Sequence, residues 1–274
     1  MTLEAIARSV RSKVVRMAHF GKTPHVGSAL SCVDLLVGLY FDRLNVDPEQ
    51  PAHPRRDRFI LSKGHGCMAL YATLAERGFF PEAVLEEYAR DGGRLAEHPG
   101  PHCVPGVELA TGSLGHGLSV GAGLALAAKI SGQDYRTFVL LSDGECEEGS
   151  IWEAALFAPA RNLDNLTVII DYNKWSAMDR THQRLAPLGR KWEAFGWDTI
   201  EIDGHDMTSV TGALALSGNP TAIIAHTVKG KGVSFMEDDL EWHYRPPTKA
   251  DLERALAEIG AAEAKREIKV EVMA

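Results

Sequence analysis

The stretch from Arg136 to Trp175 constrains the fold of this chain more than any other. An apolar run at 138–141 predicts a buried strand, a helical segment follows at 150–161, and a second apolar run at 166–170 predicts another buried strand. Strand, helix and strand in so short a span are typical of a βαβ unit, whose two strands run parallel. We therefore expect an α/β domain in which the carboxyl ends of these two strands lie side by side.

Each of these strands is followed by a residue with a side-chain oxygen. Asp143 comes after the first strand and Asn173 after the second, so both should lie at the edge where open α/β sheets bind ligands. A carboxylate and an amide oxygen are hard donors that suit Mg²⁺ or Ca²⁺, and Mg²⁺ would keep other positions for water and phosphate oxygens. Asp-Gly and Tyr-Asn are also common turn formers, so the two residues alone do not establish a metal site.

The remainder of the chain predicts further elements around this unit. Thr2 is an expected N-cap, and Ser31 with Asp34 and Ser150 with Glu153 fit the capping-box pattern. Strands are expected at 58–62, 197–202 and 221–225, and helices at 2–20, from near 31, and at 66–77, 81–90, 117–131, 206–216 and 248–264. These elements predict a single domain, 1–274, with a mainly parallel sheet of five or six strands sandwiched by helices.

Composition narrows the class of protein. The net charge of −8 argues against a nucleic-acid-binding surface. The long stretch of low polarity, 112–130, contains His116 and many small residues, so we expect a packed helix and no membrane span. No secretory leader is recognisable and no C-x-x-C spacing occurs, so reduced thiols and a cytoplasmic location are expected. The cysteines are Cys32, Cys67, Cys103 and Cys146.

Histidines are frequent in the predicted loops. The loop histidines are His25, His65, His98, His116, His226 and His243. A zinc site is a poor explanation, because the close His/Cys pairs of such sites are missing. A polyhydroxylated substrate fits better, since imidazoles can both donate hydrogen bonds to sugar hydroxyls and accept them. The long irregular segment 91–117 leads to a glycine cluster at the start of a helix, where free backbone N–H groups could bind an anion.

The motif Asp143-Gly144-Glu145, with Asn173 and a Lys-Trp pair further on, closely resembles the thiamine-diphosphate fingerprint of transketolases. The resemblance implies the diphosphate-binding domain of the thiamine-diphosphate fold. It further implies that Asp143, Asn173 and the backbone carbonyl of Trp175 hold a Mg²⁺ that bridges the two phosphates. The cofactor-binding residues that it implies are Gly112, Ser113, Leu114, Gly115, Ser142, Asp143, Gly144, Glu145 and Asn173. Ser142 is a departure, because the family often has glycine there.

The same resemblance implies roles for the loop histidines. Four of them match histidines that line the substrate channel of transketolases, and His243 matches one implicated in proton transfer. These four expected catalytic residues are His25, His65, His98 and His243. His102, His116 and His205 are expected to be supporting or structural. Glu148 and Glu153 match glutamates at the interface of two active sites, although a favourable interaction with a helix N-terminus also explains acids at these places.

The resemblance extends to about residue 245, which is barely half of a full-length transketolase. The pyrimidine-binding domain, with the glutamate that activates the cofactor, has no counterpart here. We therefore expect the N-terminal subunit of a split transketolase, a homodimer within a heterotetramer that also contains a C-terminal subunit. Such an enzyme would move a two-carbon glycolaldehyde unit from a ketose (phosphate) to an aldose (phosphate). The alternatives are another thiamine-diphosphate-dependent carboligase, acting on a modified sugar or a 2-oxo acid, and a degenerate non-catalytic homologue.

Overall fold

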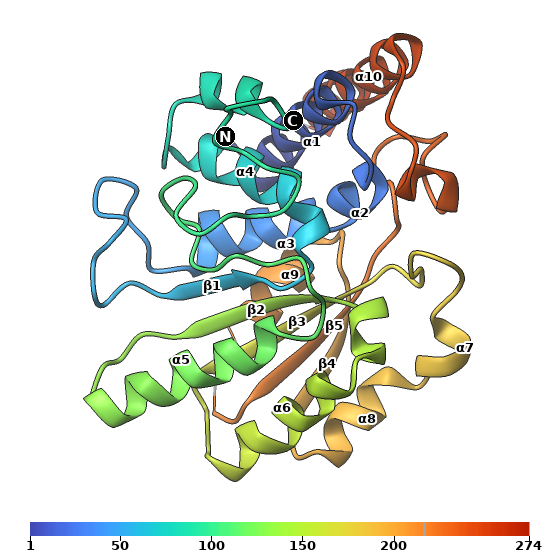
Figure 1. The fold of residues 1–274 in the computed structure, drawn as a ribbon. Helices are drawn as coiled ribbons and strands as arrows, with labels where there is room; N and C mark the ends of the chain where they lie inside the picture. The colour runs from blue at the N-terminus through green and yellow to red at the C-terminus, as the bar shows by residue number, and fades with distance from the viewer. Residues whose placement is uncertain (216–217, 274) are drawn as a thin grey trace.

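Five parallel strands form the centre of the molecule (Figure 1). The computed structural model describes residues 1–215 and 218–273, with side chains through residue 261. The spatial order of the strands is β1-β2-β3-β5-β4, and every neighbouring pair is parallel. The predicted parallel sheet is therefore confirmed, with five strands. They are β1 (Arg58–Leu61), β2 (Thr137–Ser142), β3 (Leu166–Tyr172), β4 (Asp198–Asp203) and β5 (Thr221–His226).

Helices cover both faces of this sheet. One face carries α1 (Leu3–Gly21), α2 (Val26–Ser31), α3 (Val33–Gly38), α4 (Cys67–Arg77), α9 (Met207–Leu214) and α10 (Lys249–Met273). The other carries α5 (Gly117–Ser131), α6 (Gly149–Ala160) and α8 (Leu188–Ala194). Short turns complete the set: α7 (His182–Leu185), a π-helical turn (Leu39–Arg43) and 3₁₀ turns at Gly64–Gly66, Glu82–Glu87, Gly144–Glu147 and Leu240–His243. No helix in the described ranges is long and apolar enough to cross a membrane.

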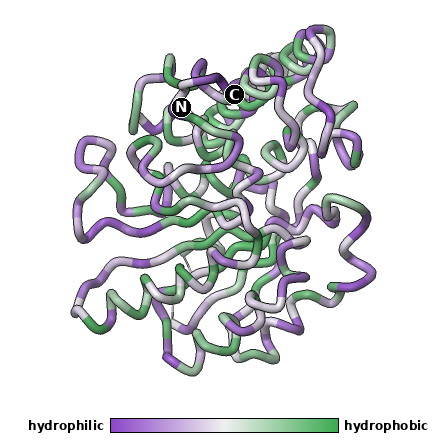
Figure 2. Tube along the Cα trace, viewed as in Figure 1, coloured by the Kyte–Doolittle hydropathy of each residue, from purple (hydrophilic) through white to green (hydrophobic). Residues whose placement is uncertain are grey.

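Alternate residues of the central strands enter two separate hydrophobic cores. In β2, Phe138 and Leu140 pack with the layer that contains α1, whereas Val139 and Leu141 pack with α5 and α6. All six residues of β2 are buried, because helices cover both faces of a parallel sheet. Figure 2 shows the hydrophobic colour concentrated along these central strands. This double burial is the reason why β2 and β3 are continuous apolar runs in the sequence.

Two predicted capping boxes are wrong, because distant partners bind the side chains concerned. Ser150 donates its hydroxyl to the carbonyl of Gly115 (2.8 Å) and makes no cap at α6. Ser31 donates to the carboxylate of Asp171 (2.6 Å), and Asp34 binds Arg11 of α1 and His205. The expected N-cap Thr2 is confirmed, because its side chain accepts from the first turn of α1 (3.3 Å).

Three predicted helix boundaries also change. The helix expected from near 31 begins at Val26, after His25 in a left-handed conformation (φ 71°), and a break at Cys32 separates α2 from α3. The segment 81–90 forms only a short 3₁₀ turn, because Ala89 (φ 53°) and Gly92 (φ 73°) reverse the chain. The last helix continues to Met273, past its expected end near 264, through a stretch rich in Ala, Glu and Lys. The end predicted for α9, residue 216, lies outside the described residues.

Candidate functional site

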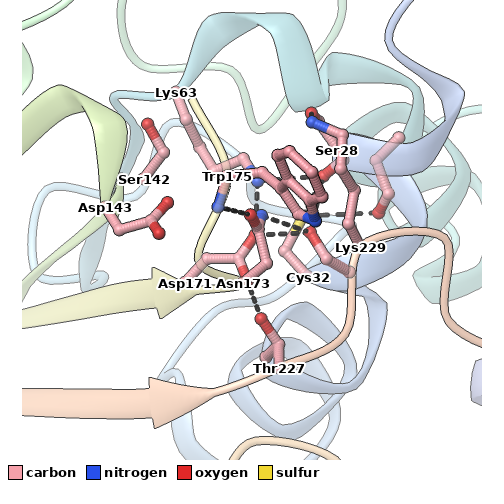
Figure 3. Close-up of polar contacts among 12 residues, drawn as sticks. Ser28, Cys32, Lys63, Ser142, Asp143, Asp171, Asn173, Trp175, Thr227 and Lys229 are labelled. Carbon is pink, nitrogen blue, oxygen red and sulfur yellow. Dashed lines mark hydrogen bonds and ion pairs between the residues drawn. The ribbon is translucent and has the colours of Figure 1, made fainter. Parts of the chain in front are cut away.

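Strands β2 and β3 deliver two oxygen-bearing side chains to one edge of the sheet. Ser142 at the end of β2 is in register with Asp171 of β3, so Asp143 and Asn173 leave neighbouring parallel strands. Asp143 is fully buried and Asn173 nearly so. Figure 3 shows both side chains beside the loop that carries Trp175. The two predicted metal-binding side chains thus occupy the carboxyl edge of the sheet, where such folds bind ligands.

Oxygen donors at this edge fit a Mg²⁺ ion. The Asp143 carboxylate accepts hydrogen bonds from Gly144 N–H (3.0 Å) and from the Thr181 hydroxyl (2.6 Å). Burial raises the pKa of Asp143 to about 7, a desolvation cost that a cation would offset. The Asn173 Oδ1 atom accepts from Trp175 N–H (3.1 Å), and this turn brings the Trp175 backbone near the amide. A carboxylate, an amide oxygen and a carbonyl form the all-oxygen set that Mg²⁺ prefers.

This donor set is small. Within the described residues no group of three or more His, Cys, Asp or Glu side chains is arranged to hold a metal ion. A Mg²⁺ ion bound by Asp143, Asn173 and the Trp175 carbonyl would therefore need other oxygens to complete its octahedron. Water and the phosphates of a cofactor are the usual sources of such oxygens. The chemistry of the site thus suits a metal that is bound together with a diphosphate.

A buried ion pair supports the Asn173 side of the site. Lys63 Nζ contacts the carboxylate of Asp171, and both side chains are inaccessible to solvent. Thr227 and Ser31 also donate to this carboxylate, and Ser31 accepts from the Asn173 amide nitrogen (3.4 Å). Burial would raise the pKa of Asp171, but Lys63 holds it below its usual value. This network orients the Asn173 amide. It was not predicted from the sequence, although two signals were available: Lys63 directly follows a predicted strand, and Asp171 lies at the end of another.

A second buried lysine, Lys229, was also missed. Its Nζ atom lies 2.9 Å from His243 Nδ1 and 3.3 Å from the Ser28 hydroxyl. Burial, reinforced by the neighbouring charge of Lys63, lowers the pKa of Lys229 to about 8. Asp143 and Asp171 act in the opposite direction. The sequence signal was a lysine in the Gly-containing loop after the last strand, VKGKG, which fits no Walker pattern.

Four predicted histidines gather in one cluster. The ring centroid of His25 lies 5.5 Å from that of His65, 6.0 Å from that of His98 and 4.9 Å from that of His243. Burial and nearby positive groups lower the pKa of His25 to about 4 and that of His243 to about 3. Burial also lowers the pKa of His65 well below its usual value. These three imidazoles are therefore neutral at neutral pH, and each can present one donor and one acceptor.

The histidine cluster, Asn173 and Trp175 line a single cavity of about 410 Å³. Most of the predicted site residues line it: His25, His65, His98, Gly112, Leu114, Ser142, Gly144, Glu148, Asn173, Trp175 and His243. Ser28 and the loop residues Ser176, Ala177 and Met178 complete much of the wall. Asp143 is buried and does not line this wall. Ser113 lines a different hollow, next to His116.

Glu145 and Gly115 lie near the cavity without lining it, and Glu145 holds the surrounding loops together. Its fully buried carboxylate accepts from Gly115 N–H (2.8 Å), from Ser142 N–H (3.3 Å) and from the Ser62 hydroxyl (2.5 Å). Gly115 has φ 87°, and a Cβ there would lie 2.5 Å from the Ser150 hydroxyl oxygen. The contact of Glu145 or Gly115 with a cofactor therefore stays a prediction, whereas their place in the supporting loops is clear.

Glu148 lies at the N-terminus of α6 and is exposed in this chain. Its side chain makes no capping hydrogen bond, so only the favourable interaction with the helix dipole is visible. Glu153 is exposed one turn further along the same helix. The predicted position of Glu148 at an interface between two active sites requires another chain and stays a prediction.

Comparison with known proteins agrees with this geometry. The profile of a family described as transketolase, thiamine diphosphate binding domain, matches residues 3–274. The solved transketolase from Leishmania mexicana superposes with a TM-score of 0.88 at 30% identity, over 95% of this chain and 41% of that one. The fold is therefore that of a thiamine-diphosphate-binding domain.

Two curated relatives are similar over nearly their whole length. A protein from Actinobacillus succinogenes, named as one of the subunits of an apulose-4-phosphate transketolase, is 46% identical over 94% of this chain and 95% of its own. A Clostridium protein, named as one of the subunits of a 6-deoxy-6-sulfo-D-fructose transketolase, is 42% identical over 86% of this chain and 88% of its own. This chain belongs to the transketolase family.

Proposed function

We propose that residues 1–274 form a single domain that binds the diphosphate end of thiamine diphosphate through Mg²⁺, as one subunit of a two-polypeptide ketol transferase. The observation that carries the proposal is that Asp143 and Asn173 leave neighbouring parallel strands, and that Asn173 and the neighbours of Asp143, Ser142 and Gly144, line a cavity together with four histidines. Bound there, thiamine diphosphate supplies the nucleophilic carbon and the electron sink for moving a two-carbon glycolaldehyde unit from a ketose to an aldose.

Each polar group of the site has a role in this proposal. Asp143, Asn173 and the Trp175 carbonyl hold the metal, and the buried Lys229 adds positive charge for the diphosphate. Backbone groups of the 112–115 loop and of Gly144, together with Ser142, surround the cofactor. The neutral histidines bind the hydroxyls of the sugar, where one nitrogen donates while the other accepts. His243 is the proposed proton carrier because it lies within hydrogen-bonding distance of Lys229 (2.9 Å).

A modified sugar is a second candidate substrate. The relatives named above act, by their names, on apulose 4-phosphate and on 6-deoxy-6-sulfo-D-fructose. Both compounds carry an anionic group on a sugar, so we infer that the substrate here is a ketose with a phosphate or a comparable anionic group. A 2-oxo acid is less well supported, because four clustered imidazoles suit several hydroxyls better than one carboxylate. The presence of Asp143 and Asn173 at the carboxyl edge of the sheet, together with the four clustered histidines, argues against a degenerate, non-catalytic homologue.

We also propose a C-terminal partner subunit that carries the pyrimidine-binding domain. The relatives are named as subunits, and the solved transketolase is matched over only 41% of its length. Helices α5 and α6 expose apolar side chains that a second copy of this chain would cover, giving a homodimer within a heterotetramer. These are Val120 (38%), Ile130 (79%), Leu156 (62%) and Phe157 (37% exposed). The four cysteines are free, in keeping with the proposed cytoplasmic location.

The proposal is tested by removing the charged metal ligand. Asp143→Ala should abolish retention of thiamine diphosphate and Mg²⁺ by the assembled enzyme, because no other carboxylate of the proposed set remains. Isothermal titration in the presence of the partner measures this loss. Asp164→Ala is the matched control, since Asp164 is half exposed and pairs with Lys129 on the surface. Equal cofactor affinity for Asp143→Ala and the parent would show that the metal site is assigned wrongly.

A further inference from the structure

A polar network outside the lining of the cavity joins α1, α3 and the turn after β4. Arg11 of α1 donates from Nη1 to Asp34 Oδ1 (3.0 Å) and from Nη2 to Asp34 Oδ2 (2.5 Å). His205, in the turn between β4 and α9, has its Nδ1 atom 2.7 Å from Asp34 Oδ2. The three side chains are only 7–11% exposed. Asp34 is therefore a buried carboxylate shared by one guanidinium and one imidazole.

This network fixes the backbone on both sides of Lys229. His205 Nε2 accepts a hydrogen bond from Val228 N–H (2.9 Å), and Arg11 Nε donates to the carbonyl of Lys231 (3.0 Å). Lys229 lies between these two anchored residues, and its ammonium group projects to Ser28 at the cavity wall. A long lysine side chain has many rotamers, so an anchored backbone limits where its charge can lie.

The hydrogen bonds assign the tautomer of His205. A backbone N–H can only donate, so Nε2 must carry the lone pair, and the proton must lie on Nδ1, where it is donated to Asp34. Burial alone would raise the pKa of Asp34, but Arg11 and His205 hold it at about 2, so the carboxylate stays ionised. A doubly protonated imidazole would place Nε2–H against Val228 N–H and lose that anchor.

We propose that His205, backed by the Arg11–Asp34 ion pair, is a positioning residue for Lys229, and that it sets the lysine charge against the diphosphate of the bound cofactor. The inference rests on the proposed function, because it presupposes that the cavity takes a diphosphate. His205 itself does not line that cavity and acts only through the backbone at Val228.

The tautomer can be measured on the full chain without cofactor. Long-range ¹⁵N–¹H correlation spectra of the ¹⁵N-labelled protein at pH 7.5, with His205 assigned by its loss in His205→Asn, should show a neutral ring protonated on Nδ1. The Val228 amide should shift in the same variant. A ring protonated on Nε2, or on both nitrogens, would overturn the assignment.

Pyrophosphate with Mg²⁺ is the probe for the positioning role. His205→Asn keeps a donor for Asp34 but cannot reach Val228, so the Kd of the full chain for magnesium pyrophosphate should rise at least fivefold. His205→Gln should restore part of the affinity, because its amide oxygen can accept from Val228 N–H. His226→Gln is the control, since His226 pairs with Glu201 (2.8 Å) and not with this loop. A Kd for His205→Asn within twofold of the parent would refute the proposal.

A double-mutant cycle shows whether His205 acts through Lys229. The double variant His205→Asn/Lys229→Ala should bind pyrophosphate no more weakly than Lys229→Ala alone. Additive losses would mean that His205 acts elsewhere and would overturn the inference. If the unsubstituted chain does not bind pyrophosphate, both this inference and the proposed diphosphate site are wrong. If it binds pyrophosphate and the His205 variants bind it equally well, only this inference is wrong.

Discussion

At the scale of single residues, the four clustered histidines have the most direct consequence for catalysis. His65→Ala and His98→Ala should each lower kcat/KM for the ketose more than tenfold, or about 1.4 kcal/mol of transition-state stabilisation, because each removes contacts to sugar hydroxyls. Steady-state kinetics of the assembled enzyme measures this. Cofactor affinity should change much less, and His53→Ala, an exposed histidine on a distant loop, should be neutral. Parallel loss of cofactor and substrate would assign that histidine to the diphosphate site instead.

The depressed pKa values of the cluster also predict how stability changes with pH. His25 is neutral in the folded chain down to about pH 4, whereas an unfolded histidine takes up a proton near pH 6.5. The unfolded state therefore binds more protons in this window, and stability is lost as the pH falls from about 6.5 towards 4. Asp143, whose pKa is raised, changes stability in the opposite sense, so a comparison of variants is needed.

Urea unfolding of the cofactor-free chain and of His25→Gln at pH 7.5 and pH 5 makes that comparison. The parent should lose about 1 kcal/mol more than the variant between these two pH values, after allowance for the partial exposure of the ring. Asp143 is common to both proteins and cancels. An identical pH dependence for the two proteins would show that His25 does not bear the depressed pKa.

At the scale of elements, two explanations for an acid at position 148, the N-terminus of α6, can be distinguished by experiment. If this acid lies between two active sites, Glu148→Gln should slow cofactor activation in the assembled enzyme about tenfold, because a proton-carrying group is lost. Hydrogen–deuterium exchange at the reactive carbon of the cofactor follows this rate. Glu253→Gln, an exposed acid on α10 that pairs with Lys249, is the control. A loss of only a few tenths of a kcal/mol of stability, with activation unchanged, would leave the helix dipole as the sufficient explanation.

The elements also show how far sequence reasoning could reach. The parallel sheet could be predicted because β2 and β3 are buried on both faces, which leaves continuous apolar runs, and their ends located Asp143 and Asn173. The Lys63–Asp171 pair could not be predicted, because the sequence does not show which buried charges meet across the fold. The capping box predicted at Ser31 was wrong for a related reason. Its local pattern fits a capping box, but a carboxylate more distant in sequence is the stronger partner.

At the scale of the whole molecule, a sheet with all its strands parallel and helices on both faces leaves the carboxyl edge of the sheet uncovered. The cavity lies at the carboxyl ends of the strands, and Trp175, Ser176 and Met178 form part of its wall. Met178 is 85% exposed, although it lines the site. In the two-polypeptide proposal, the second domain would close over this side chain. The open edge thus agrees with a cofactor that is shared between two polypeptides.

The last prediction concerns that second polypeptide. Alone, the 274-residue chain should bind thiamine diphosphate weakly and show no ketol transfer. The reason is that the proposed site binds only the diphosphate end of the cofactor and includes no residue that would bind the aminopyrimidine. Addition of a subunit with a pyrimidine-binding domain should tighten cofactor binding at least tenfold and produce activity with an anionic ketose. Calorimetry and a coupled aldose assay measure both, and Asp143→Ala with the same partner is the negative control. Robust glycolaldehyde transfer by this chain with only Mg²⁺ and thiamine diphosphate would contradict the two-polypeptide proposal, since a complete active site would then be present without the partner.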